Sequence, residues 1–249
     1  MPTLARHTTY DTDSNLNNHN ITGFNASGTN GLLVVKAMSK YVDETGFEVQ
    51  VDGTAIDHQV TIGGDGTAGT SIWTTVIDDA SVDVTVHIPS WKQASAIVEY
   101  WEGVDQSTPI ANTFSKSAWS SAMTDSVTGA SADNELVYGI NTQNNRDLTI
   151  ATGGTEIAQF NGAGGIGAVA GGHRASSTSA QDVGWTAGSG DNYRLAVVEL
   201  AKGAGDEPEP DSNVSVKSGG TFGSGATKVK VSGSFVSGVV KHKSGGTFS

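Results

Sequence analysis

Carboxylates that lie close together in the sequence are the first residues that could do chemistry. Two groups stand out: Asp78, Asp79 and Asp83, and Glu99 with Glu102 around Trp101. Paired carboxylates beside a sugar are the machinery of a glycosidase. A structural interpretation competes with this one, because Asp78-Asp79 has the composition of a turn and Glu99 recurs as Glu199 in a similar segment. We favour the structural interpretation and predict that the protein is not an enzyme.

The remaining polar residues form no pattern of a metal or nucleotide site. The six histidines are scattered: His7, His19, His58, His87, His173 and His242. Neither a Gly-x-Ser-x-Gly elbow nor a P-loop is present. DTDSN (11–15) spaces its oxygens as a calcium loop begins, but Leu16 and Thr22 stand where an EF-hand needs Gly and Glu. A loose surface calcium site is left open, and we expect no cofactor.

Tryptophan could supply a platform on which a sugar stacks. The chain has five: Trp73, Trp91, Trp101, Trp119 and Trp185. Trp91 (IPSWKQ) and Trp119 (KSAWSSA) lie in polar segments that predict loops. These two are our candidates for contact with a glycan; contact with another subunit and plain packing are the alternatives.

The elements that position these residues are predicted to be β-strands. Short runs rich in Val, Ile and Thr alternate with Gly, Asn, Asp and Ser, and no long stretch has helical periodicity. In VDVTVHI (82–88) one face is apolar and the other carries Asp83, Thr85 and His87. The chain has no cysteine, so disulfides and thiolate-bound metals are excluded. The fold class predicted is all-β.

The segment 1–202 is predicted to be one domain built from two similar halves. Three pairs of stretches match at an offset near 100: NGLLVVKAMS (30–39) with NELVYGINTQ (134–143), VQVDGTAI (49–56) with TIATGGTEI (149–157), and SAIVEYWEG (95–103) with RLAVVELAKG (194–203). Stacked face to face, two such halves give a two-sheet β-sandwich.

The end of the chain is different in composition. GAGDEPEPDSN (203–213) is an acidic linker that contains two prolines, and residues 214–249 form the repeat segment, with three copies of a 13-residue unit. The repeats place in register Lys217, Lys230 and Lys243, and also Phe222, Phe235 and Phe248. We predict a short β-meander that orders on assembly, since units below about 40 residues rarely fold alone; a disordered Ser/Gly-rich tail is the alternative. These six residues are the predicted docking residues.

Charge divides the chain in the same place. The net charge of −12 is the sum of −17 over residues 1–213 and +5 over the repeat segment. The acidic part argues against nucleic-acid binding, and the basic repeats suit an acidic protein surface. No apolar run approaches the roughly 20 residues of a membrane helix, so we expect no membrane partner.

Two stretches resemble bacteriophage proteins. VEYWEGVDQSTPI (98–110), in order with the opening NGLLVV (30–35), VQVDGTAI (49–56) and AVVEL (196–200), resembles a family of phage and prophage virion structural proteins. VKSGGTF, VKVSGSF and HKSGGTF resemble the tandem VKVGGVWK-like repeats that end phage tail and fibre proteins, with Phe in the place of Trp.

The resemblance implies a jelly-roll-like fold and a structural role in a virion. We therefore expect a non-enzymatic fibre, knob or head-decoration component that assembles, as a homo-oligomer and with other virion proteins, through its repeats. A carbohydrate-binding receptor-recognition or adhesin module is the alternative, with host-surface glycans as partners. The first twenty residues hold no apolar stretch of a secretory signal. We expect the protein on the particle surface after release by lysis.

Overall fold

The structure is a computed structural model that describes residues 1–203, apart from 13, 44, 64, 65, 67, 163 and 164, and four short strands within 227–248. For residues 80, 89–91 and the four short strands it describes the backbone alone. The chain divides into two compact units, the body (Met1–Gly203) and the C-terminal unit (Ala204–Ser249).

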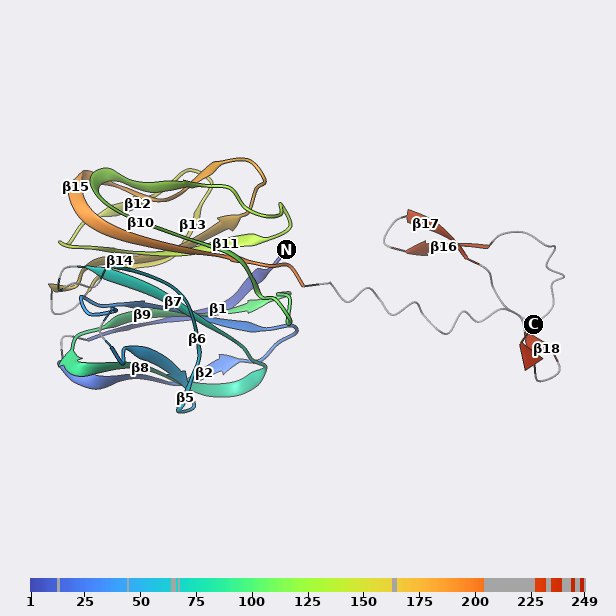
Figure 1. Cartoon of the computed structure of the whole chain (residues 1–249), viewed down its shortest axis with the longest axis horizontal. Coiled ribbons are helices and arrows are strands. Elements are labelled where there is room, and N and C mark those ends of the chain that lie inside the picture. The colour runs from blue at the N-terminus through green and yellow to red at the C-terminus, as the bar shows by residue number, and fades with distance from the viewer. Residues whose placement is uncertain are drawn as a thin grey trace. The chain divides into compact units, whose positions relative to one another are not determined.

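The body consists of β-strands, which confirms the predicted fold class (Figure 1). The first half contains β1 (Thr3–Asp11), β2 (Leu16–Ala26), β3 (Leu32–Met38), β4 (Glu48–Val51), β5 (Thr54–Ala55), β6 (Asp57–Gly63), β7 (Gly69–Val76), β8 (Asp79–Lys92) and β9 (Ser95–Glu102). The second half contains β10 (Ile110–Val127), β11 (Glu135–Thr142), β12 (Leu148–Ile150), β13 (Thr155–Gly162), β14 (Gly167–Ala175) and β15 (Gln181–Leu200).

The two halves have the same topology. The inner sheet of the first half has the order β1-β9-β3-β7-β6, and its counterpart in the second half has the order β10-β15-β11-β14-β13. The outer sheet of the first half, β2-β8-β4-β5, corresponds to β12 and the far ends of β10 and β15. In the second half, therefore, the single long strand β10 corresponds to both β1 and β2. The single long strand β15 corresponds to both β8 and β9.

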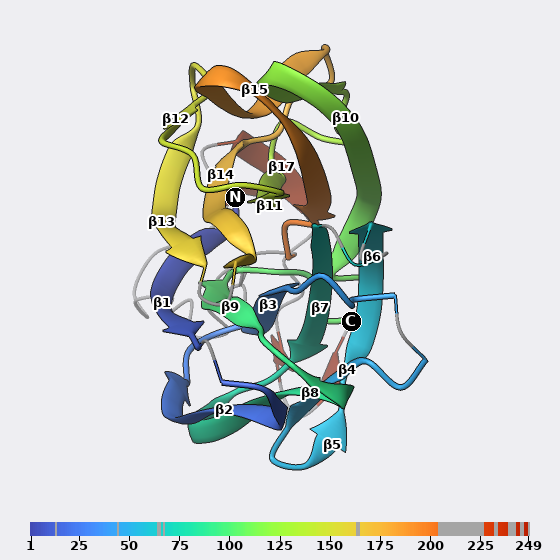
Figure 2. The ribbon, with the colours of Figure 1, turned by 90° about the vertical axis from the view of Figure 1, so that its left-hand side faces the viewer.

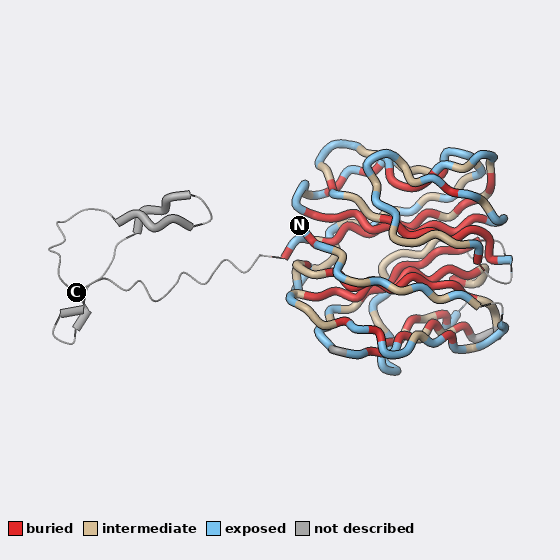
Figure 3. Tube along the Cα trace, turned by 180° about the vertical axis from the view of Figure 1, so that it is seen from behind, coloured by how far each residue is buried: buried red, intermediate tan, exposed pale blue. Residues whose placement is uncertain are grey.

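The halves stack face to face, as the sequence predicts, but each half is itself two layers deep. Figure 2 shows the order from bottom to top: the outer sheet of the first half, the two inner sheets, and the curled-over ends of β10 and β15. Figure 3 shows buried residues running through the middle layers. The sequence gives no direct sign of the outer layers, because the strands that form them alternate like any half-exposed strand.

Three apolar layers hold the stack together. One core lies between the sheets of the first half and includes Val84, Val86 and Tyr100. A second lies inside the second half and includes Tyr138 and Trp185. The third joins the inner sheets of the two halves; it contains Leu32, Val34, Ile72, Trp101, Val104, Val137, Ala196, Val198 and Leu200. Strands such as β3 are apolar on both faces because each face meets another sheet.

Local sequence explains the individual strands. In β8, Val82, Val84, Val86 and Ile88 are buried while Asp83 is exposed, as the alternation predicts. The β4–β5 hairpin turns through Asp52 and Gly53, whose φ angles of 49° and 76° are those of a two-residue type I′ turn.

The predicted equivalence of Glu99 and Glu199 is wrong by one residue. Leu33 pairs with Tyr100 in the first half, and Leu136 pairs with Glu199 in the second. Because Leu33 and Leu136 each face the core of their own half, Glu199 corresponds to Tyr100. Glu99 faces the other half instead. A slip of one residue moves a strand side chain to the opposite face, which an ungapped sequence match cannot detect.

The C-terminal unit contains two hairpins among its described residues. β16 (Thr227–Val231) pairs with β17 (Ser234–Gly238), and β18 (Lys243–Ser244) pairs with β19 (Thr247–Phe248). Each pair forms a two-stranded sheet of its own, whereas we predicted a single meander. In the second and third repeats the two strands that pair are separated by only two residues in the sequence, Ser232-Gly233 and Gly245-Gly246, so each pairing is local.

Candidate functional site

Trp119 stands out on the surface of the body. Its side chain is 70% exposed, whereas Trp73, Trp101 and Trp185 are all at most 8% exposed. It lies within β10, so the loop predicted for it is wrong. β10 is an edge strand in which exposed residues alternate with partly buried ones. Its exposed positions are mostly polar, and their composition is therefore similar to that of a loop. Trp91 likewise lies in a strand, β8, and its side chain is outside the described residues.

A bulge between β10 and β15 positions the indole. Trp119 pairs directly with Asn192, and the register then shifts, so that residues 187–190 of β15 stand opposite only Ser121. The far edge of the Trp119 ring lies over Gly190, where a Cβ would come within 2.7 Å of it. Any larger residue at position 190 would displace the ring. Bulges commonly re-aim a side chain in this way beside functional sites.

Two amide side chains, Asn192 and Gln143, lie beside Trp119 on the same surface. Side chains of directly paired residues lie on the same face of a sheet, so Asn192 adjoins the indole. Asn192 donates from Nδ2 to Gln143 Oε1 at 2.7 Å, and the Gln143 backbone N–H donates to the Asn192 carbonyl at 2.9 Å. The sequence signal for this feature is QNNRD (143–147), a polar cluster directly after a buried strand, and we did not predict it as a site.

A buried carboxylate fixes the loop that carries these amides. Asp191 is 2% exposed and accepts hydrogen bonds from Asn144, at 3.0 Å from the backbone N–H and 2.9 Å from Nδ2. The Arg146 guanidinium Nε lies 3.2 Å from Oδ2 of the same carboxylate. The loop is therefore held against the β15 bulge before any ligand arrives.

A surface depression of about 410 Å³ adjoins this loop. Its lining consists of Lys40, Gln143, Asn144, Asn145 and Gly165. Gln143 thus belongs both to the depression and to the row that leads back to Trp119. An aromatic ring, a row of amides and a polar hollow form one continuous surface, which we call the Trp119 face.

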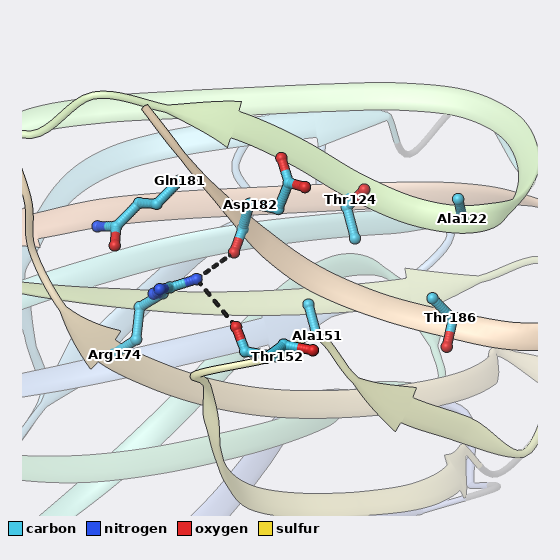
Figure 4. A pocket seen from close by; sticks show the side chains of 8 residues that line it. All are labelled: Ala122, Thr124, Ala151, Thr152, Arg174, Gln181, Asp182 and Thr186. Carbon is cyan, nitrogen blue, oxygen red and sulfur yellow. Dashed lines mark hydrogen bonds between the residues drawn. The ribbon is translucent and has the colours of Figure 1, made fainter. Parts of the chain in front are cut away.

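A second depression, of about 490 Å³, lies between the curled ends of β10 and β15 and the residues after β12 (Figure 4). Its cation, Arg174, donates from one guanidinium nitrogen to the carbonyls of Thr152, at 3.3 Å, and Asp182, at 2.5 Å. The other lining residues are small or hydroxyl-bearing: Ala122, Thr124, Ala151 and Thr186, with Gln181 at the rim. Arg174 therefore has a structural role: it links the segment after β12 to the start of β15.

Three of the carboxylates considered for catalysis have structural partners: the Gly28 N–H donates to Asp78, the Gly23 N–H donates to Asp83, and Glu99 pairs with Lys36. Glu99 is fully buried between the halves, where it accepts from the Lys36 ammonium and, at 3.0 Å, from Trp101 Nε1. Burial lowers the pKa of Lys36, and the neighbouring Glu99 carboxylate opposes that effect. Gly139 and Gly171 of the second half make room for the Lys36 side chain, since a Cβ on either would lie 3.2 Å from it.

Glu199 is enclosed by hydrogen-bond donors. Its carboxylate accepts from Ala130 N–H at 2.9 Å, Asn112 Nδ2 at 2.6 Å, Asn134 Nδ2 at 3.0 Å and Ser176 Oγ at 2.8 Å. Burial by itself raises the pKa of Glu199, but these hydrogen bonds outweigh it, and the pKa lies below its ordinary value.

Metal-binding clusters are absent from the part of the chain that the structure describes. There, no group of three or more His, Asp or Glu residues could hold an ion. Asp13, in the middle of DTDSN, lies outside the described residues, so the loose calcium site stays a prediction.

The docking residues of the repeat segment are partly described. Lys230 pairs with Phe235 and Lys243 pairs with Phe248, each directly across its hairpin. The second and third repeats therefore share one register. Lys217 and Phe222 lie outside the described residues.

The chain was compared with known family models, with curated proteins and with solved structures, and no match was found in any of the three. Within the described residues there is also no helix of the length and apolarity that crossing a bilayer requires.

Proposed function

We propose that this chain is a non-enzymatic structural component of a bacteriophage virion, displayed on the particle as a fibre, knob or decoration and attached through its repeats. The observation that carries the proposal is the shared register of the two hairpins, with Lys230 opposite Phe235 and Lys243 opposite Phe248. A hairpin alone is at best marginally stable in water, so the repeat hairpins would gain stability by packing on a partner.

The chemistry of the repeats suits a protein partner. Each repeat presents a cation and an aromatic ring at fixed positions, and the repeat segment holds five Lys and no acidic residue. The partner surface we propose is acidic, on another virion protein or on a second copy of this chain. Virion appendages are symmetric, so a homo-oligomer is expected.

The test is to locate the protein on native particles by electron microscopy with gold-labelled antibody against the body. Label at regular points on a capsid or tail is the expected result. Particles that stay bare while the protein is found free or on cells would overturn the proposal.

A complementation experiment tests the role of the repeats. Particles are grown with the full chain, with Phe222, Phe235 and Phe248 all changed to Ala, or with the matched control Ser237→Ala within β17. We expect the triple variant to be absent from purified particles while its body keeps the wild-type melting temperature. Incorporation of the triple variant at the wild-type level would exclude the rings from attachment.

A carbohydrate-recognition module is the second candidate. The observation in its favour is the exposed indole of Trp119. The two functions are compatible in one virion protein.

A further inference from the structure

The Trp119 face lies at the end of the body opposite the point where the chain leaves it. Ile110, at the start of β10, pairs with Leu200, close to the exit at Gly203. Trp119 is nine residues further along the same strand, which is about 30 Å at the rise of a β-strand. In Figure 1 the bend of β10 and β15 is at the left of the body and the chain exit at the right. A body attached through its C-terminal side would present this end outward.

The indole has the surroundings of a stacking platform. A Trp ring offers a large, rigid apolar face with a polar edge. Gly190 fixes the Trp119 ring from below without covering it, and 70% of the side chain remains in contact with water. The apolar face of a pyranose ring is the ligand surface that such a platform matches in size and polarity.

The polar neighbours match the rest of a sugar. Asn192 and Gln143 carry amide groups that can each donate and accept, which is what hydroxyl and acetamido groups require. The hydrogen bond between them leaves Asn192 Oδ1 and the Gln143 Nε2 hydrogens available on the exposed rim. The depression of about 410 Å³, lined in part by Gln143, Asn144 and Lys40, continues this polar surface. Few convergent polar groups beside an aromatic wall are typical of small-molecule sites.

We propose that the Trp119 face binds a neutral oligosaccharide, with one pyranose stacked on Trp119 and the next residues held by Asn192, Gln143 and the depression. Neutral saccharides are favoured over acidic ones because the body (residues 1–203) carries 9 Lys and Arg against 22 Asp and Glu, a net charge of −13, which repels polyanions. The Asp191–Asn144–Arg146 network keeps the amide loop in place, so little ordering accompanies binding.

The experiment measures binding of the purified full chain to four neutral hexasaccharides, those of cellulose, amylose, chitin and β-mannan, and to the acidic polymer of sialic acid as a comparison. Titration calorimetry and quenching of Trp fluorescence by acrylamide are the readouts. We expect saturable binding of at least one neutral hexasaccharide, together with protection of one exposed Trp from acrylamide, and no binding of polysialic acid.

Three variants assign the response to the site. Trp119→Ala is expected to weaken binding at least about tenfold, and Asn192→Ala about threefold to tenfold, the range of one lost hydrogen bond. Thr113→Ala, on the same exposed face of β10 but away from the bulge, is the matched control and should bind as wild type. Because Trp119 is largely exposed, its removal should leave the melting temperature unchanged, which separates lost binding from lost folding.

Three results would overturn the inference. They are no binding of any neutral hexasaccharide, binding that Trp119→Ala leaves intact, and preferential binding of polysialic acid. A fall in oligomeric state on Trp119→Ala, in a protein that binds none of the probes, would make this face a contact between copies. The assay uses the free protein, so its failure would leave the virion proposal standing, and bare particles in microscopy would leave the saccharide site standing.

Discussion

At the scale of single residues, Glu199 tests whether a buried charge contributes to stability. The donors around its carboxylate lower its pKa below the ordinary 4.5. A carboxylate with a lowered pKa in the folded state adds stability that is complete above the unfolded value and is lost as the pH falls through the folded value. We expect Glu199→Gln to cost about 3 kcal/mol at pH 7, because an amide places two N–H donors against donors.

The measurement is the urea midpoint of both proteins at pH 7 and at pH 3. The difference between them should shrink at pH 3, because the carboxylate binds a proton more readily in the unfolded wild type than in the folded one, whereas Glu199→Gln has no group there to titrate. Asp182→Asn is the control on the same strand, exposed at the surface, and should change the midpoint little at either pH. If Glu199→Gln lowers the stability equally at both pH values, the packing of the Glu199 side chain, and not its charge, accounts for its contribution.

At the scale of elements, the Lys36–Glu99 pair joins two neighbouring strands, β3 and β9, of the inner sheet of the first half, on the face that meets the second half. Both side chains are fully buried. Removing one member of such a pair leaves an uncompensated charge, which costs about 3–5 kcal/mol. We expect Lys36→Met to lose that much, and Lys36→Met with Glu99→Gln to recover most of it, because the amide oxygen introduced by Glu99→Gln would still accept from Trp101 Nε1.

A double-mutant cycle in urea measures this coupling. The control is Lys116→Met, which breaks the pair with Asp125 at 3.4 Å on the surface, where the side chains are 41% and 27% exposed. That loss should stay below about 1 kcal/mol. Purely additive losses for Lys36→Met and Glu99→Gln would show that the two side chains are not energetically coupled.

The strands themselves could be predicted from the sequence, since alternation in β8 and the doubly apolar β3 follow directly from which faces are buried. The face that each strand of the second half presents could not, because the matches near an offset of 100 do not detect a slip of one residue. The candidate site was half predicted: Trp119 was named, but Asn192 and Gln143 were not, since both are far from Trp119 in the sequence and adjoin it only through strand pairing and the hydrogen bond between them.

At the scale of the whole molecule, acidic and basic character lie in different parts of the sequence: the body (residues 1–203) has a net charge of −13, and the repeat segment has +5. The body carries the acidic surface and the Trp119 face, and the repeat segment carries five Lys and three Phe. Attachment through the repeat segment and saccharide binding by the Trp119 face would then use different surfaces. Each can be removed by substitution without disturbing the other.

The charge division gives a prediction for the assembled state. If the +5 repeat segment docks on an acidic surface, raising the salt concentration should weaken attachment, because the Debye length falls from about 10 Å at 0.1 M to about 3 Å at 1 M. We expect the protein to be released progressively when particles are washed with NaCl from 0.05 to 1 M, measured by quantitative blotting of the supernatant. Changing Lys217, Lys230 and Lys243 to Gln should shift release to lower salt. Attachment that resists 1 M NaCl, in the wild type and in this variant alike, would assign docking to Phe222, Phe235 and Phe248 through apolar burial instead.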